Sequence, residues 1–241
     1  MIAIIIYGPP GAGKGTQAQL LAEKFDLIHF DSGKYLRELL YNPKNKNNKI
    51  IQKEKKLNEA GKLNTPSWVL KIVSGKVKEI AGLLHKGVVL SGSPRTIFEA
   101  LGNLPAGQAG DKNIGLMEIL EKMYSKKNIY VFKINVSENQ TIERNTHRLI
   151  CSVCGTPILD MSIILPKCKN TDISQCPFCG GKFKHRFDDN KKVIITRLKE
   201  YSERTAPIVN ELKKRKYKVI EIDGSPMPYK IHEKIRSFIK K

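Results

Sequence analysis

The stretch that decides the fold is residues 2–17, IAIIIYGPPGAGKGTQ. Its first six residues form an uninterrupted run rich in β-branched side chains, which is typical of a strand buried on both faces of a parallel sheet. The residues that follow have the spacing G-x4-G-K, in which glycines let the backbone wrap closely around phosphates at a helix N-terminus. Lys14 would reach the β- and γ-phosphates, although Gly15 separates it from Thr16. The sequence therefore predicts a phosphate-binding loop between a buried strand and a helix.

The alternation of strand and helix continues along the chain. Short apolar runs predict further strands at 88–90, 129–136 and 217–222. Helical periodicity fills the intervals, at 14–25, 33–41, 66–84, 138–148, 190–215 and 228–239. Strands that alternate with helices predict βαβ units and a doubly wound parallel sheet of the α/β class. Two stretches depart from this pattern: residues 42–64 are polar and helix-like, and residues 149–186 are Cys-rich and irregular. Residues 102–115 are expected to be a loop insertion without an assigned function.

Length and charge limit the classes of protein that remain. The 241 residues suffice for one large domain or a core with small insertions, and the net charge is +20. Clustered positive charge favours nucleic acid, but here it is spread over Lys-rich segments, such as residues 42–64 with seven Lys and two Glu. Solvated helix faces are the simpler interpretation. No apolar run approaches the length of a membrane span and no signal peptide is recognisable, so a soluble, cytoplasmic protein is expected.

Four cysteines form two C-x2-C pairs separated by twenty-one residues: Cys151, Cys154, Cys176 and Cys179. This spacing predicts a tetrahedral, structural Zn²⁺ site with four thiolate ligands, whose binding energy would fold a loop too short for its own core. Two disulfides are the alternative, which a reducing cytoplasm disfavours. Iron is a lesser option for four thiolates. Cys168 lies outside both pairs and is expected to be a spare thiol.

Six arginines stand in contexts that suggest phosphate binding: Arg37, Arg95, Arg144, Arg148, Arg186 and Arg197. Arg95 follows the sequence Ser-Gly-Ser-Pro at the end of a predicted strand, where α/β sheets bind their ligands. Arg144 and Arg148 are four residues apart, on one face of the predicted helix before the cysteines. Arg186 and Arg197 follow the cysteines. Phosphoryl transfer needs many positive groups around a spread negative charge, and these arginines could supply them.

Taken together, the motifs resemble those of the adenylate kinases, in the form of the nucleoside monophosphate kinase family that carries a zinc-containing lid. The resemblance covers nearly the whole chain and rests on the phosphate loop, the four cysteines and five further stretches. These stretches are DSGKYLR at 31–37, GKL at 61–63, GSPRT at 92–96, RFDD at 186–189, and RLKEY at 197–201 with TAP at 205–207. The phosphate loop alone would not separate nucleotide-binding families, but this order of motifs is specific.

The resemblance implies a P-loop kinase core with a parallel five-stranded sheet covered by helices, a helical monophosphate-binding segment and a zinc-binding lid. The implied boundaries are core at 1–31, monophosphate segment at 32–64, core at 65–148, lid at 149–186 and core at 187–241. The implied reaction is MgATP plus AMP giving two ADP, in a monomer whose lid closes and excludes water. Zn²⁺ in the lid and Mg²⁺ with ATP are the implied cofactors.

Residue roles follow from the same resemblance. The implied catalytic set is Lys14, Arg95, Arg148, Arg186 and Arg197. The implied ATP-binding set is Gly8, Gly11, Ala12, Gly13, Lys14, Gly15, Thr16, Arg144 and Arg148, with Arg144 stacking on adenine. The implied AMP-binding set is Ser32, Gly33, Arg37, Gly61, Leu63, Asn64, Thr65, Gly92, Arg95, Glu99, Arg186 and Arg197.

The sequence departs from the family pattern at four positions. Lys34 and Ser91 replace two aspartates that orient magnesium-bound waters, and Asp31 could compensate. Glu99 replaces a glutamine that reads adenine; an ionised carboxylate only accepts hydrogen bonds and would suit guanine better. Leu149 replaces a second lid arginine. Two alternatives therefore stay open: a kinase for GMP, UMP or CMP, and a catalytically weak homologue that binds nucleotides or RNA.

Overall fold

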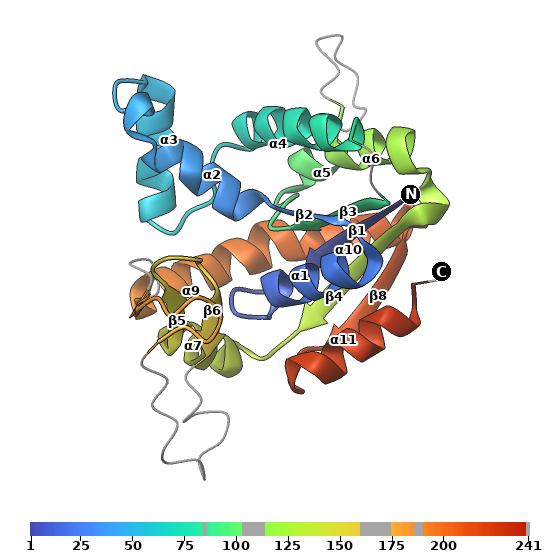
Figure 1. The fold of residues 1–241 in the computed structure, drawn as a ribbon. Helices are drawn as coiled ribbons and strands as arrows, with labels where there is room; N and C mark the ends of the chain where they lie inside the picture. Colours follow the sequence, from blue (N-terminus) through green and yellow to red (C-terminus); the bar gives the residue numbers. More distant parts are fainter. Residues whose placement is uncertain (84–85, 103–113, 160–174, 186–189, 240–241) are drawn as a thin grey trace.

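A central parallel sheet organises the computed structural model, which describes residues 1–83, 86–102, 114–159, 175–185 and 190–239. Its strands are β1 (Ile2–Tyr7), β2 (Ile28–Asp31), β3 (Gly87–Ser91), β4 (Ile129–Asn135) and β8 (Lys218–Asp223). They are arranged in the order β2-β3-β1-β4-β8, and every pair is parallel (Figure 1). The predicted α/β class and the five-stranded sheet are confirmed.

The two faces of β1 pack into two separate hydrophobic cores. Ala3, Ile5 and Tyr7 point to one core, which α4 (Pro66–Ala81), α6 (Leu116–Tyr124) and α10 (Ala206–Lys214) cover. Ile4 and Ile6 point to the other core, under α1 (Lys14–Phe25) and α11 (Pro228–Ser237). A strand that is apolar on both faces is thereby buried on both faces, which fixes it at the centre of the sheet.

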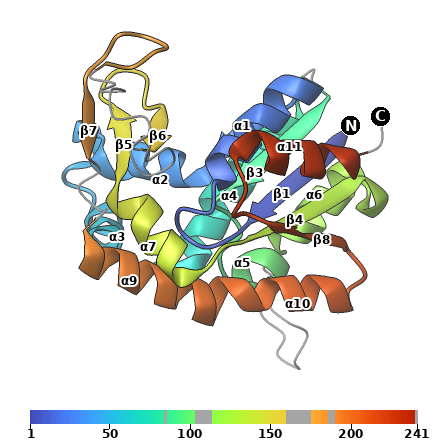
Figure 2. The same cartoon turned by 90° about the horizontal axis from the view of Figure 1, so that it is seen from below.

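Two structural units extend from the sheet. One contains α2 (Ser32–Tyr41), the 3-10 turn η1 (Pro43–Asn45) and α3 (Lys49–Glu59). The other is an antiparallel sheet of β5 (Arg148–Cys151), β6 (Pro157–Leu159) and β7 (Phe183–His185), which follows α7 (Glu138–Thr146) (Figure 2). The remaining short elements are α5 (Ile97–Leu101) and the turn η2 (Lys126–Asn128).

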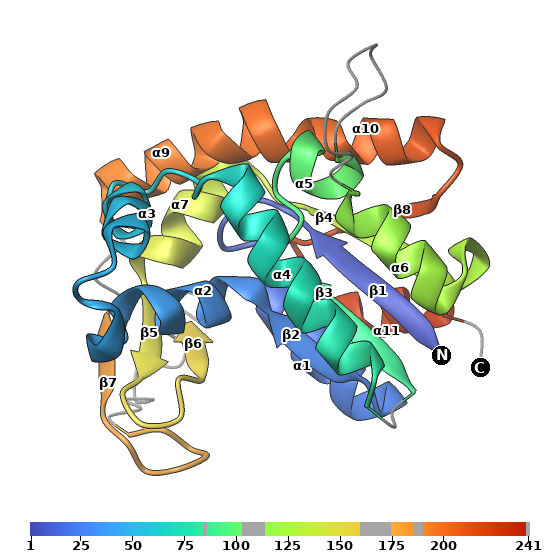
Figure 3. The ribbon, with the colours of Figure 1, turned by 90° about the horizontal axis from the view of Figure 1, so that it is seen from above.

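A long helical run spans the molecule and joins both units to the core (Figure 3). It consists of α9 (Lys191–Glu200), one π-helical turn η3 (Tyr201–Thr205) and α10. A π-helical turn inside a helix often marks a functional position. Here Tyr201 and Thr205 both line the cavity that contains Lys14.

Several expectations from the sequence are corrected. The helix predicted over 138–148 ends at Thr146, and Arg148 begins β5, so Arg144 and Arg148 do not share a helix face. Residues 149–186 were expected to be irregular, but their described part forms the three-stranded sheet. Strand β2 and helices α5 and α6 were not predicted, because β2 is short and polar and the two helices flank the 102–115 loop. Residues 103–113 of that loop lie outside the described residues, and a bridge joins Gly102 to Ile114 at its ends.

Candidate active site

The phosphate loop connects β1 to α1 and takes a conformation that requires glycine. Gly11 and Gly13 have φ angles of 77° and 85°, in the left-handed region that other residues rarely adopt. A Cβ atom on Gly11 would also lie 2.5 Å from Nδ2 of Asn145, a buried residue of α7. The loop therefore packs against α7 and directs the N-terminus of α1 toward the carboxyl ends of the strands, where an anion is favoured.

Lys14 folds back onto this loop. Its ammonium donates to the carbonyl oxygens of Gly8 at 2.8 Å and of Pro9 at 2.7 Å. Removal from water and the nearby charges of Arg95, Arg197 and Arg148 together lower the pKa of Lys14 to about 7, although Asp31 raises it. The sequence predicted this lysine, and the structure surrounds it with positive groups that only an anion would offset.

A second positive site lies at the N-terminus of α2. A Cβ atom on Gly33 would lie 3.2 Å from Nη2 of Arg95 and 3.6 Å from Nη1 of Arg37. Gly33 thus lets two guanidinium groups converge over the first turn of α2, beside Oδ1 of Asp31, which caps the helix and would lie 3.2 Å from the same Cβ position. This geometry suits the phosphate of a nucleotide.

Arg95 is held in place through its backbone from two sides. Its N–H donates to Oε2 of Glu99 at 2.8 Å, and its carbonyl accepts from the hydroxyl of Thr205 at 2.8 Å. Its side-chain Nε donates to the carbonyl of Gly92. Two backbone contacts and one side-chain contact hold Arg95, so its guanidinium is preorganised for an oxyanion.

One cavity joins the two positive sites. Of the expected residues, it is lined by Gly8, Lys14, Gly33, Arg37, Gly61, Leu63, Asn64, Gly92, Arg95 and Arg197. The other described residues of the expected sets are not among its lining residues: Gly11, Ala12, Gly13, Gly15, Thr16, Ser32, Thr65, Glu99, Arg144 and Arg148. Sequence reasoning missed Tyr7, Lys62, Glu200 and Tyr201, which also line it. Lys62 lies in the stretch GKL, Glu200 and Tyr201 lie in RLKEY, and Tyr7 ends the first predicted strand, but the sequence assigned no role to any of the four.

Two carboxylates hold the segment between α3 and α4. Oε2 of the buried Glu54 accepts from the backbone N–H of Thr65 at 2.8 Å and from Nδ2 of Asn64 at 3.0 Å. On the other side, Oε2 of Glu200 accepts from the N–H of Leu63 at 3.3 Å and from Arg204 at 3.0 Å. The cavity wall at Leu63 and Asn64 is therefore fixed by α3 and by the end of α9.

Glu99 belongs to a capping arrangement at the start of α5. Thr96 accepts from the N–H of Glu99 at 3.1 Å and donates its hydroxyl to Oε1 of Glu99 at 3.1 Å. The other oxygen, Oε2, accepts from Arg95. Burial raises the pKa of Glu99, while the hydrogen bonds from Arg95 and Thr96 lower it. Both carboxylate oxygens thus already have local partners.

The remaining arginines lie around the edge of this region. Nη2 of the half-buried Arg144 donates to the carbonyl of Ser225 at 3.3 Å, which ties α7 to the loop after β8. Arg148 is close enough to Lys14 to lower its pKa. Arg186 lies outside the described residues. Asp31 accepts from the N–H of Lys34 at 3.0 Å and caps α2.

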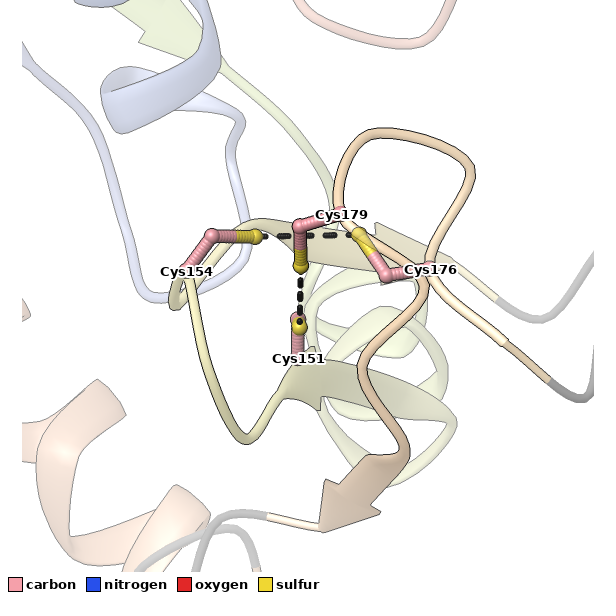
Figure 4. A group of neighbouring side chains, drawn as sticks. All are labelled: Cys151, Cys154, Cys176 and Cys179. Carbon is pink, nitrogen blue, oxygen red and sulfur yellow. Dashed lines mark hydrogen bonds between the residues drawn. The ribbon is translucent and has the colours of Figure 1, made fainter.

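The four cysteines meet at one point, as their spacing predicted (Figure 4). Their sulfur atoms all lie within 4.8 Å of one another, with 3.4 Å between Cys151 and Cys179 and 3.6 Å between Cys154 and Cys176. All four are free thiols. Four thiolates around Zn²⁺ at about 2.3 Å would lie about 3.8 Å apart, so this group fits a structural zinc site. Cys168 lies outside the described residues.

A phosphate loop and a second anion site that share one cavity define a P-loop phosphotransferase of the nucleoside monophosphate kinase class. Among the described residues, no helix is long and apolar enough to cross a membrane.

Comparison with known proteins agrees with this class. The chain matches the sequence model of the family described as "Adenylate kinase" over residues 6–217. It is 34% identical over 239 residues to an adenylate kinase of Elusimicrobium minutum, covering 99% of this chain and 98% of the relative. It is 32% identical over 238 residues to an adenylate kinase of Clostridium tetani, covering 98% and 97%. The chain belongs to the adenylate kinase family.

Proposed function

We propose that this enzyme transfers the γ-phosphoryl group of MgATP to AMP and releases two molecules of ADP. An oxygen of the AMP phosphate forms the new bond to the γ-phosphorus, and the bond from that phosphorus to the β–γ bridging oxygen breaks. The observation that carries the proposal is the single cavity with Lys14 at one anion site and Arg37 with Arg95 at the other. The relatives named above support AMP as the acceptor.

The phosphate loop from Gly8 to Thr16 would bind the ATP phosphates, with Lys14 on the β- and γ-groups. Arg144 and Arg148 would contact the remainder of ATP. Arg95 and Arg197, with Arg148 and Arg186, would neutralise the charge on the transferring group. The acceptor would be bound by residues of three segments: Ser32, Gly33 and Arg37; Gly61, Leu63, Asn64 and Thr65; Gly92, Arg95 and Glu99.

Mg²⁺ fits the oxygen groups at the phosphate loop. Thr16 is exposed in the first turn of α1, and the charge of Asp31 at the end of β2 acts on Lys14, so both residues lie beside the phosphate loop. These are the hard oxygen donors that Mg²⁺ binds, directly or through water. When bound, the ion would neutralise part of the phosphate charge.

The proposal divides the chain as the motif resemblance implies. Residues 32–64 would bind the monophosphate, residues 149–186 would form a zinc lid that closes over ATP, and the rest would form the core. A monomer that acts in the cytoplasm is part of the same proposal.

A coupled assay with ATP and each of AMP, GMP, UMP and CMP tests the reaction. We expect AMP to be the best acceptor, and Arg95→Lys to lower kcat by about 10²-fold, because a point charge does not replace a fork of donors. Arg236→Lys, an exposed residue of α11, is the matched control and should leave kcat unchanged. The absence of turnover with every acceptor over a wide Mg²⁺ range would refute the proposal.

The variant Glu99→Gln tests how the enzyme selects the base of the acceptor. If the Glu99 carboxylate reads the base, Glu99→Gln should raise the ratio of AMP to GMP turnover. An unchanged ratio would leave the carboxylate with its capping role at Thr96 and Arg95 alone. A preference of the unaltered enzyme for GMP would support the alternative acceptor.

A further inference from the structure

A chain of four polar side chains connects α1 to the carboxyl ends of β2 and β3. Nε2 of Gln19 donates to Oε1 of Glu23 at 2.7 Å, and both residues lie on the exposed side of α1. Oε1 of Gln19 lies 3.2 Å from Nδ1 of His29 on β2. Nε2 of His29 lies 2.8 Å from Oγ of Ser91, the last residue of β3.

The direction of every hydrogen bond in this chain follows from its exposed end. A carboxylate only accepts, so the amide nitrogen of Gln19 faces Glu23 and its carbonyl oxygen faces His29. That oxygen also only accepts, so Nδ1 of the imidazole carries the proton. In the neutral ring Nε2 then has a lone pair, and the Ser91 hydroxyl donates to it.

This arrangement determines what Ser91 offers to its other neighbours. Its backbone carbonyl accepts from the hydroxyl of Ser32 at 3.3 Å, and its own proton is given to His29. The oxygen of Ser91 retains lone pairs, and the described residues supply no further donor to it. Ser91 is 3% exposed, and the next residue, Gly92, lines the cavity. Ser91 pairs with Ile6 of β1 and with Asp31 of β2, and both Ile6 and Gly92 line the cavity, so the Ser91 hydroxyl lies beside the phosphate end of the site.

We propose that His29 is a positioning residue that keeps the Ser91 hydroxyl oriented as a hydrogen-bond acceptor toward water bound to the magnesium of the nucleotide. The proposal rests on the function proposed above. With its proton donated to His29, the Ser91 hydroxyl would only accept hydrogen bonds from other groups, as a carboxylate does. Lys34 cannot perform this task because it is cationic. Asp31 caps α2 through Oδ1, so Ser91 would act beside Asp31 rather than in its place.

Burial, the largest influence on His29, favours the neutral ring. Burial lowers its pKa, Asp31 on its own strand raises it, and Lys34 on α2 lowers it. From α1, Glu23 acts only through Gln19, and β3 presents the uncharged Ser91. Protonation of the ring would place a proton on Nε2 and turn the Ser91 hydroxyl into a donor. Acid should therefore reverse the orientation on which the proposal depends.

The tautomer of His29 can be measured on the whole protein without turnover. Long-range ¹H–¹⁵N correlation spectra at neutral pH should show the Nδ1-protonated tautomer, and Gln19→Leu should remove this preference. An Nε2-protonated ring in the unaltered protein would overturn the proposal.

Activity variants then test the link to Ser91. We expect His29→Phe to lower kcat about tenfold at limiting Mg²⁺ and to raise the Mg²⁺ concentration that gives half-maximal rate. His29→Gln, whose amide oxygen can accept from Ser91, should restore most of the loss. In a Ser91→Ala background, His29→Phe should have no further effect, because the hydroxyl that it orients is absent.

Two further outcomes separate this proposal from others. Equal losses from His29→Phe with and without the Ser91 hydroxyl would show a merely structural role and overturn it; melting curves of each variant identify loss through unfolding. Failure of the unaltered enzyme to transfer phosphoryl groups would refute the proposed function, whereas the tautomer and MgATP affinity would still report on His29.

Discussion

At the scale of single residues, Lys14 combines a P-loop position with an unusual protonation equilibrium. Its ammonium donates to two carbonyls, but the charges of Arg95, Arg197 and Arg148, the last at the start of β5, lower its pKa. With a pKa of about 7, Lys14 is partly neutral in the nucleotide-free protein near pH 7. Because the unfolded chain holds this proton up to about pH 10.5, the free protein should gain stability as the pH rises from 7 toward 10.

This equilibrium predicts proton uptake on nucleotide binding. The phosphates offset the arginines and raise the pKa of Lys14, so at pH 8 binding should take up roughly nine-tenths of a proton. Calorimetry of a non-hydrolysable MgATP analogue in buffers of different ionisation enthalpy measures this number. Lys14→Met should abolish the uptake. A binding enthalpy that does not depend on the buffer at pH 8 would contradict the prediction.

At the scale of elements, Glu54 connects α3 to the cavity wall at Leu63 and Asn64. Replacing it by alanine removes the acceptor of the Thr65 N–H and leaves the Asn64 amide only the backbone carbonyl of residue 54, which should lower the free energy of unfolding by about 2 kcal/mol. The KM for the acceptor should rise, because Leu63 and Asn64 lose their fixed position. Denaturant titration and steady-state kinetics measure the two effects.

Glu59→Ala is the matched control for this prediction. Glu59 lies on the same helix but is exposed, and its ion pair with Lys55 is long at 4.0 Å. Its loss should therefore change the free energy of unfolding by less than about 0.5 kcal/mol. Equal effects at both positions would mean that the contacts of Glu54 do not stabilise the wall.

The small sheet of β5, β6 and β7 should depend on metal, because it shares no strand with the central sheet and has little core of its own. We expect a single zinc ion per chain by metal analysis. Cys176→Ser should lose the metal and lower kcat about tenfold or more, since the lid would no longer order, while the central sheet keeps its circular dichroism. Cys168→Ser, outside the two pairs, should retain both metal and activity. Metal-free, fully active protein under reducing conditions would disprove the zinc site.

At the scale of the whole molecule, the charge of +20 should draw anionic substrates toward the cavity. We expect kcat/KM for both nucleotides to fall several-fold as ionic strength rises from about 20 mM to about 0.3 M, with kcat little changed. Replacing Lys49, Lys53 and Lys56, on α3, by glutamine should weaken this dependence. If kcat falls instead of kcat/KM, the positive charge does not act on association.

Much of this molecule could be predicted where the chemistry is local. Consecutive or closely spaced residues specify the strand and loop at 2–17 and the cysteine site. Strand β2 could not be predicted, because Ile28–Asp31 is short and contains two polar residues; it is a strand because β3 supplies its hydrogen bonds. The end of α7 before Arg148 could not be predicted either, because pairing with β6 and β7 overrides helical periodicity.

The sequence by itself determined the fold class, the phosphate loop, the cysteine site and the arginines that converge on the cavity. The phosphate loop and the cysteine pairs depend on residue types at fixed short spacings, which local backbone geometry converts directly into structure, whereas the arginines were indicated by the motifs in which they stand. Only the tertiary structure decided that Glu99 contacts the cap of α5 and that Glu54 and Glu200 hold the cavity wall between α3 and α4. It also decided that His29 contacts Ser91, 62 residues further along the chain. Those contacts join elements far apart in the chain, and their geometry is set by how helices pack on the sheet.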